Sequence, residues 1–268
     1  MKRLLLILLF VFTSAITFAA HFYGGGIEYS NIGNRKWKVT LKFISDCASP
    51  TGVCSNFSTC TMGVLAKPNP FLNPIGATAN PSSISAALAL VKIEDINKIE
   101  VLQLGNIAKN YCTNLGQQTS GSQSPSWEVY TFEGVLDMST PLLNNTTCAY
   151  WDIYTSGSAR SSNLVNISTS LYTLKSTLNI FYKSTISDGL KCNSAKMNNH
   201  YLFRVTAGDV VSYNPAAIDV DGDSLNYFIG QAYQDNITAA SYAAPFSNTY
   251  PFPLNQTAEP HISYPQGI

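Results

Sequence analysis

The sequence predicts an all-β protein built from antiparallel β-sandwich domains. Short segments in which apolar and polar residues alternate recur along the chain, as in half-buried strands. These segments are rich in β-branched and aromatic residues, and Gly, Pro, Asn and Ser separate them. Many short strands divided by such turn residues favour packed sheets over helical or α/β architectures.

The first 19 residues predict a cleavable secretory signal. A positive start, Met1-Lys2-Arg3, precedes an apolar run at 4–12, and small residues lead to a cleavage site near Ala19-Ala20. The run is shorter than the roughly 20 residues that a membrane span needs. We therefore expect a secreted chain with no transmembrane segment after cleavage; a retained N-terminal anchor is the alternative.

The clearest strand pair lies near the predicted mature N-terminus. Residues 36–43 alternate strictly between apolar residues and Lys or Thr, and Ile27 and Tyr29 alternate in the same way upstream. Between them, residues 31–34 read Asn-Ile-Gly-Asn, and both Gly and Asn tolerate positive φ. This arrangement predicts a β-hairpin.

Further strands are expected at intervals down the chain, and the Ala-rich residues 82–90 are equally compatible with a short helix. A change of pattern near residues 187–192 predicts a boundary between an N-terminal β-sandwich-like domain, 20–188, and a second module, 189–268. The additional strands are predicted at 62–66, 88–93, 99–104, 127–136, 149–154, 177–182, 200–206, 210–213 and 225–229.

An even number of cysteines behind a secretory signal predicts disulfides. The first three are spaced without a C-x-x-C pair or a nearby His, which disfavours zinc. We expect one bridge within residues 47–60, and the remaining connectivity stays open. The candidates are Cys47, Cys54, Cys60, Cys112, Cys148 and Cys192.

An acidic loop is the sharpest local motif. Asp219, Asp221 and Asp223 alternate, so their carboxylates are expected to converge and repel one another. A bound Ca²⁺ would remove that repulsion, because it is a hard cation that takes about six to eight oxygen ligands. The loop is not an EF-hand, since Gly222 stands at its fourth position and Gly230 where the bidentate Glu belongs. Two interpretations remain: a Ca²⁺ site, and a solvated acidic turn that leads into a strand.

Composition and motifs exclude several classes of function. Lys+Arg and Asp+Glu balance at 16 each, so nucleic acid is not an expected partner. The chain has no G-x-S-x-G, H-E-x-x-H, P-loop or G-x-G-x-x-G motif. No catalytic residue is predicted, and we expect a protein that is not an enzyme. Two alternatives stand: a carbohydrate-binding module with an exposed aromatic row, and a secreted hydrolase in which two acids, or a Ser or Cys with a His, meet in a cleft.

Several segments resemble, in their order along the chain, large secreted surface proteins of gliding bacteria. The segment at 216–229 is also similar to the D-x-D-G-D-x-L-x-Y motif of cadherin-like and immunoglobulin-like modules. The segments are HFYGGGIEYSNIGNRKWKVTLKFISDC, NYCTN, YTFEGVLDM, CAYWDIYTSGSARSSNLVNI and AAIDVDGDSLNYFI.

The resemblance implies tandem β-sandwich modules at the exterior of the outer membrane, in a type 9 secretion and gliding-motility setting. It makes 189–268 an Ig- or cadherin-like module, truncated here, and carries Asp219, Asp221 and Asp223 over as a calcium-binding loop. The family usually carries a far C-terminal sorting domain, which is not recognised in this sequence; we expect either a piece of a longer protein or a short relative that stays periplasmic. The expected function is a structural or adhesion protein of the cell surface, stabilised by Ca²⁺, with other surface proteins or glycans as partners.

Overall fold

The structure is a computed structural model of the chain. It describes residues 22–46, 59–67, 85–92, 100–103, 112–114, 117–118, 126–140, 150–158, 160, 164–169, 171–179, 192–199 and 214–248.

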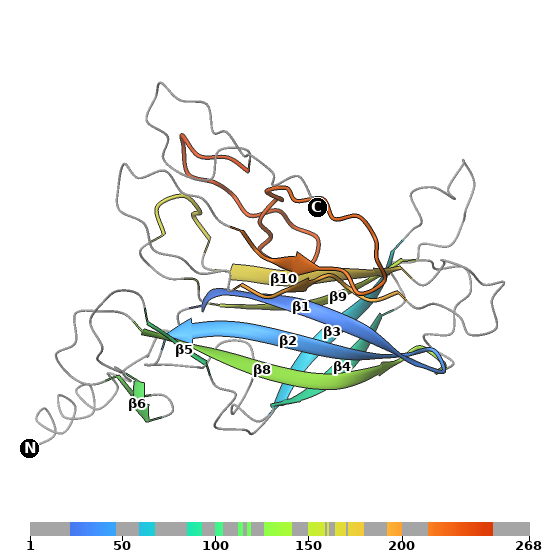
Figure 1. The fold of residues 1–268 in the computed structure, drawn as a ribbon. Coiled ribbons are helices and arrows are strands. Elements are labelled where there is room, and N and C mark those ends of the chain that lie inside the picture. The colour runs from blue at the N-terminus through green and yellow to red at the C-terminus, as the bar shows by residue number, and fades with distance from the viewer. Residues whose placement is uncertain are drawn as a thin grey trace, which may run out of the picture.

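Every regular element within these residues is a β-strand (Figure 1), so the all-β prediction is confirmed. The strands are β1 (Phe22–Gly33), β2 (Lys36–Asp46), β3 (Thr59–Lys67), β4 (Ser85–Lys92), β5 (Glu100–Gln103), β6 (Cys112–Asn114), β7 (Gln117–Gln118), β8 (Ser126–Asp137), β9 (Tyr150–Ser158), β10 (Leu171–Asn179), β11 (Lys196–Met197) and β12 (Ala217–Ile218).

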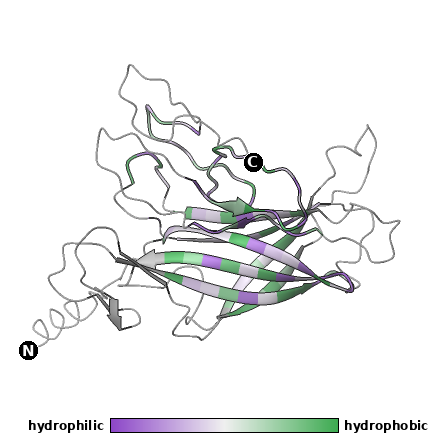
Figure 2. Ribbon diagram, in the orientation of Figure 1, coloured by the Kyte–Doolittle hydropathy of each residue, from purple (hydrophilic) through white to green (hydrophobic). Residues whose placement is uncertain are grey.

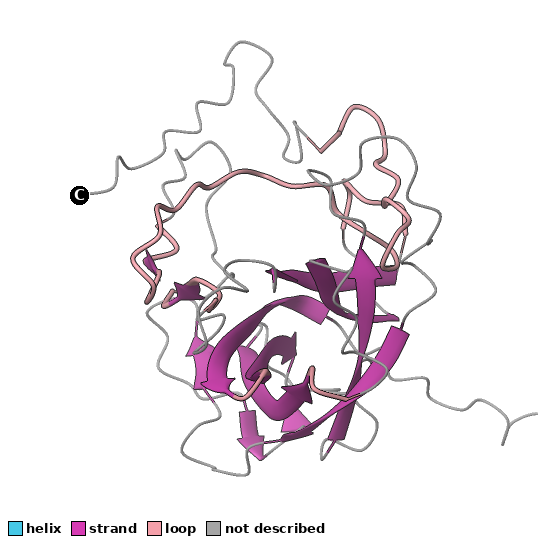
Figure 3. Cartoon of the chain, turned by 90° about the vertical axis from the view of Figure 1, so that its right-hand side faces the viewer, coloured by secondary structure: helices cyan, strands magenta, loops and turns pink. Residues whose placement is uncertain are grey.

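Seven strands form one antiparallel sheet in the order β1-β2-β8-β4-β3-β9-β10, and β5 pairs additionally with β8. The sheet curls until β1 and β10, its first and last strands, come into contact, as the end-on view shows (Figure 3). We call the gap between these two strands the seam. The sequence predicted two facing sheets, whereas these strands form one continuous, nearly closed sheet; β6 with β7 and β11 with β12 form two small separate pairs.

The long pairing of β2 with β8 joins the N-terminal hairpin to the rest of the sheet. It runs from Lys36↔Asp137 to Asp46↔Trp127 without a break, and β8 also pairs with the end of β4. This pairing spans about ninety residues of sequence, so it is set by tertiary packing rather than by a local turn.

The inner face of the sheet is filled by large apolar side chains. Trp37, Val39 and Leu41 of β2 have no exposed surface, and Trp151 and Ile153 of β9 are equally buried. Polar residues alternate with apolar residues along β2 and β8, which Figure 2 shows as alternating purple and green bands. Each large side chain buried in this way contributes about 1.5–3 kcal/mol to folding.

The predicted hairpin is confirmed as β1 and β2. Their registers place Ile27 opposite Leu41 and Tyr29 opposite Val39 on the inner face. The connecting turn uses positive φ at Gly33, Asn34 and Arg35, with values of 86°, 52° and 57°. Glycine and asparagine accept this conformation readily, which is why this sequence turns here.

Two other local predictions are now decided. The Ala-rich segment is strand β4, because its register with β3 buries Leu88 and Leu90 on the inner face. The strand predicted at 225–229 is not formed: these residues make no ladder pairing with the described chain, and Phe228 is 80% exposed. The strands predicted at 200–206 and 210–213 lie outside the described residues.

No helix in the described part of the chain is long and apolar enough to cross a membrane.

Candidate functional site

The acidic loop is shaped by its first carboxylate. Asp219 Oδ1 accepts hydrogen bonds from the backbone N–H groups of Asp221, at 2.8 Å, and Asp223, at 3.2 Å. Gly222 between them has a positive φ of 81°. An aspartate that bonds the backbone two residues on is a common turn device, so the loop has a fixed local shape.

The second carboxylate ties this loop to the sheet. The two oxygens of Asp221 accept hydrogen bonds from the backbone N–H and the side-chain Nδ2 of Asn193, at 2.8 and 2.7 Å. The side-chain oxygen of Asn193 in turn accepts the N–H of Asn31 in β1, at 2.7 Å. Asp221 therefore fixes the residue that holds the edge of β1.

The three predicted calcium ligands are not gathered into a metal-binding group. Among the described residues, which include Asp219, Asp221 and Asp223, no set of three His, Cys, Asp or Glu side chains is placed to hold a metal ion. Asp219 and Asp221 instead accept hydrogen bonds from the chain itself. Calcium stays a prediction whose remaining ligands would have to come from elsewhere.

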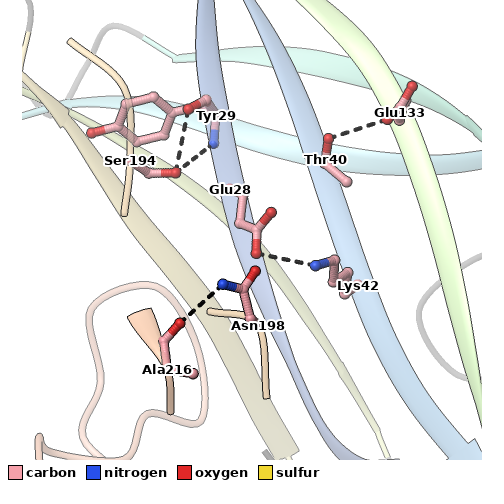
Figure 4. Close-up of polar contacts among 8 residues, drawn as sticks. All are labelled: Glu28, Tyr29, Thr40, Lys42, Glu133, Ser194, Asn198 and Ala216. Carbon is pink, nitrogen blue, oxygen red and sulfur yellow. Dashed lines mark hydrogen bonds and ion pairs between the residues drawn. The ribbon is translucent and has the colours of Figure 1, made fainter. Parts of the chain in front are cut away.

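Residues 192–194, which we call the seam segment, lie along the outer edge of β1. Ser194 donates its N–H to the Tyr29 carbonyl at 2.9 Å. Its hydroxyl accepts the N–H of Tyr29 at 2.8 Å and donates to the Tyr29 carbonyl at 3.3 Å (Figure 4). The indole N–H of the buried Trp37 donates to the Cys192 carbonyl at 3.0 Å. The seam segment thus satisfies backbone groups that an edge strand would otherwise leave unpaired.

Tyr29 joins β1 to β10 directly. Its hydroxyl donates to the Thr177 carbonyl at 2.9 Å. Burial raises the pKa of this phenol well above its usual range, and Cys192, Asp219 and Asp221 nearby raise it further. The neutral donor is therefore the form that the folded protein stabilises.

The cysteine predictions meet the structure at two positions. Cys60 is disulfide-bonded. Cys192 is present as a thiol, so the disulfide predicted for it is not formed here; its residue sits in the seam segment, where its side chain contacts the buried Tyr29 hydroxyl. Disulfides at the remaining candidates stay predictions, because those side chains lie outside the described residues: Cys47, Cys54, Cys112 and Cys148.

A groove of about 310 Å³ crosses the outer face of β1, β2 and β8. Ion pairs cross the strands within it: Lys42 Nζ lies 3.2 Å from Glu28 Oε1, and Lys38 Nζ lies 3.0 Å from Glu133 Oε1. The hydroxyl of Thr40 also donates to Glu133, at 3.4 Å (Figure 4). The groove is lined by Glu28, Tyr29, Ser30, Lys38, Thr40, Lys42, Thr131, Glu133 and Lys196.

Five of these nine lining residues are charged, in a chain of which only 12% is charged. Sequence reasoning missed this concentration because each residue occupies an outward position of an ordinary alternating strand. The available signal was the scarcity of charge elsewhere, which makes the Lys-rich outer face of residues 36–42 unusual for this chain.

A second polar cluster fixes the C-terminal part of the described chain to β9 and β10. Asp152 is only 1% exposed; it accepts the Thr177 hydroxyl at 2.7 Å and lies 3.8 Å from Lys175 Nζ. The same ammonium stands 4.0 Å from the ring centroid of Tyr233. The guanidinium of Arg160 donates to the Tyr233 carbonyl at 3.0 Å, which adds a further anchor.

Comparison of the chain with protein-family models finds no match, and comparisons with the curated proteins and with the solved structures find none either. The resemblance to surface proteins of gliding bacteria therefore stays a prediction.

Proposed function

We propose that this chain is a secreted, cell-surface structural or adhesion module that binds its partner on the outside of its sheet and has no catalytic activity. One observation carries the proposal: five of the nine residues that line a groove on the outer face of β1, β2 and β8 are charged, in a chain of which only 12% is charged. Charged groups are costly to gather without a use, because like charges repel and each ion pair on a surface stabilises little.

The packing of the sheet supports an external binding surface. Its inner face is occupied by fully buried side chains, including Trp37, Trp151 and Tyr172. A ligand would therefore bind to outward-facing residues, as it does in adhesive β modules that are rigid scaffolds for surface contacts.

The attachment of the C-terminal residues supports a structural role. The hydrogen bonds from the seam segment to β1 and β2 join residues 155 to 165 positions apart in sequence. A mechanical force on residues 214–248 would thus be transmitted to β1 through the hydrogen bonds between Asp221 and Asn193. In this proposal residues 189–268 belong to an Ig- or cadherin-like module, and Ca²⁺ at the acidic loop would stiffen the junction.

A carbohydrate-binding module is the second candidate. It is favoured by the groove, where the hydroxyls of Ser30, Thr40 and Thr131 lie among the charged groups. The aromatic row first expected for it has less support, because Trp37 and Trp151 are fully buried on the inner face.

A secreted hydrolase is the third candidate, and the groove does contain two carboxylates, Glu28 and Glu133. Each is engaged by a lysine, Lys42 and Lys38 respectively. A glycosidase needs two carboxyl groups that face the substrate across a cleft, whereas both carboxylates here are already paired with lysines of β2. We therefore place binding ahead of hydrolysis.

Surface labelling of intact source cells tests the proposal. An antibody against the chain should label intact cells, and N-terminal sequencing of the surface fraction should begin near Ala20. Cells that lack the gene should attach less to surfaces or to one another. Labelling only after lysis, with attachment unchanged in the deletion strain, would contradict the proposed function.

A further inference from the structure

The groove carries one more positive than negative charge. Its lysines are Lys38, Lys42 and Lys196, and its carboxylates are Glu28 and Glu133. Lys42 and Lys38 each form an ion pair with one of these carboxylates. Lys196 is exposed and forms no ion pair with any residue that the structure describes. An anion that enters the groove would meet a cation whose charge is not yet compensated.

Lys196 is held at the rim of the groove by local structure. It belongs to β11, where it pairs with Ile218 of β12, and Asn198 donates to the Ala216 carbonyl at 3.1 Å (Figure 4). The seam segment immediately before it is bonded to β1 through Tyr29. The backbone that carries Lys196 is thus bonded on both sides. Less conformational entropy of this segment is therefore lost when a ligand binds.

The rest of the lining matches a ligand rich in hydroxyl groups. Ser30, Thr40 and Thr131 offer hydroxyls that both donate and accept, and the two carboxylates accept from hydroxyl donors. The strands beneath use their backbone groups in the sheet ladder or, at β1, in bonds to the seam segment. A peptide therefore cannot add itself as a further strand at this place, which leaves side-chain recognition.

We infer that the groove binds a carboxylate-bearing saccharide, such as a uronic acid unit of an acidic glycan, and that Lys196 holds its carboxylate. This inference rests on the proposed function and deepens it by naming the class of ligand. The hydroxyls and carboxylates of the groove bond the sugar hydroxyls, and Lys196 distinguishes acidic from neutral sugars. Because an exposed charge pair is screened by salt, the affinity falls as ionic strength rises.

Titration calorimetry of the full chain tests the inference with two matched probes. One probe is a tetrasaccharide of galacturonic acid, and the other is its methyl ester, which keeps the sugar rings and removes the charges. The variant Lys196→Gln removes the cation from the groove. Lys36→Gln is the control, because Lys36 lies on the same sheet face, outside the groove, and pairs with Asp137.

We expect the acidic tetrasaccharide to bind the wild type and Lys36→Gln alike, and Lys196→Gln about tenfold more weakly. The methyl ester should bind wild type and Lys196→Gln equally, at the weaker level. Thr40→Val should weaken both probes, because it removes a hydroxyl that both would contact, and circular dichroism should show that its fold is intact.

Four results would overturn the inference. They are equal affinity for acid and ester, tighter binding of a tetra-aspartate peptide, displacement of the tetrasaccharide by equal concentrations of acetate, and no binding of either saccharide. None of these bears on surface labelling of intact cells. A labelled cell surface with no saccharide binding would therefore remove the ligand class and leave the proposed function standing.

Discussion

Asp221 shows how a single side chain can serve structure where the sequence predicted a metal ligand. Its two oxygens accept hydrogen bonds from Asn193, and Asn193 holds the edge of β1. Replacing Asp221 by Asn presents an NH₂ group to a donor and removes a charged acceptor. We expect a loss of about 1 kcal/mol in the free energy of unfolding, measured by urea denaturation.

Asp223→Asn is the control for that change, because the Asp223 carboxylate accepts no hydrogen bond from a described residue; it should stay within about 0.5 kcal/mol of wild type. The same variants address calcium. If millimolar Ca²⁺ raises the midpoint of thermal unfolding of the wild type, and Asp221→Asn abolishes that rise, the loop binds a metal ion as well as holding Asn193. Equal losses for both variants would contradict the role assigned to Asp221.

Two buried tyrosines should respond oppositely to loss of the hydroxyl. The Tyr29 hydroxyl donates to the Thr177 carbonyl, whereas the Tyr172 hydroxyl is buried and has no hydrogen-bond partner among the residues that the structure describes. Tyr29→Phe should cost about 1 kcal/mol, and Tyr172→Phe should be neutral or slightly stabilising, because it removes an unsatisfied polar group. Chemical denaturation at pH 7 measures both, and a larger loss at Tyr172 would contradict this hydrogen-bond assignment.

Burial raises the pKa of both tyrosines. The two tyrosine variants should therefore differ from wild type in how the free energy of unfolding depends on pH. A raised pKa means that the folded state holds the proton more tightly than the unfolded state. The associated stability is complete below the ordinary pKa of 10.0 and is lost as pH rises beyond it. Tyr29→Phe should therefore lose less stability than wild type between pH 10 and pH 12.

The half-buried Asp137 gives a prediction at acid pH. Hydrogen bonds from Ser139 and Lys36 lower the pKa of its carboxyl from 3.8 to about 2. Its contribution to stability is therefore present above pH 3.8 and is lost as pH falls toward about 2. A carboxyl-carbon NMR titration should give a midpoint clearly below 3.8 that rises in 1 M salt, where the ion pair with Lys36 is screened. A midpoint at 3.8 in low salt would contradict the contact.

At the scale of elements, the close approach of β8 to its sheet neighbour β4 depends on the absence of a side chain at Gly134. A methyl group on Gly134 would lie 2.5 Å from the Ala89 carbonyl oxygen and 2.6 Å from a methyl of Leu90. Because a backbone atom cannot move aside cheaply, Gly134→Ala should cost about 1–3 kcal/mol in urea denaturation. The neighbouring Val135 is 51% exposed, so Val135→Thr should change stability little. Equal effects of the two would show that β4 and β8 are not in this close contact.

Local pattern predicted the elements that local forces determine. The hairpin of β1 and β2 was predicted because its alternation and its turn residues agree. β4 was ambiguous, because an Ala-rich segment has no clear alternation of apolar and polar residues. Its pairing with β3 and β8 makes it a strand. Residues 225–229 alternate like a strand, but a strand needs a partner, and the described chain supplies none.

The candidate site was less predictable than the fold. The acidic loop was found because its residues are neighbours in sequence. The seam segment and the groove join residues more than ninety positions apart, such as Thr40 with Glu133 and Tyr29 with Ser194. The closure of the sheet brings them together, and no local pattern encodes that closure.

The whole molecule consists, in its described part, of a nearly closed sheet, a seam segment at residues 192–194 that bonds to β1, and a charged groove on the outer face. The core and the seam stabilise the fold, and the groove supplies a surface for a partner. These roles can be separated, because the ion pairs of the groove lie outside the buried core.

Attachment of coated beads to cells tests whether the groove binds a partner. Beads carrying the full chain would be presented to source cells, and the bound fraction counted for wild type and two double variants. Lys38→Gln with Glu133→Gln removes an ion pair in the groove; Lys36→Gln with Asp137→Asn removes a matched β2–β8 pair outside it. The account predicts attachment for wild type and for the outer control, and loss of most attachment for the groove variant. Equal attachment by all three, or none above bare beads, would contradict it.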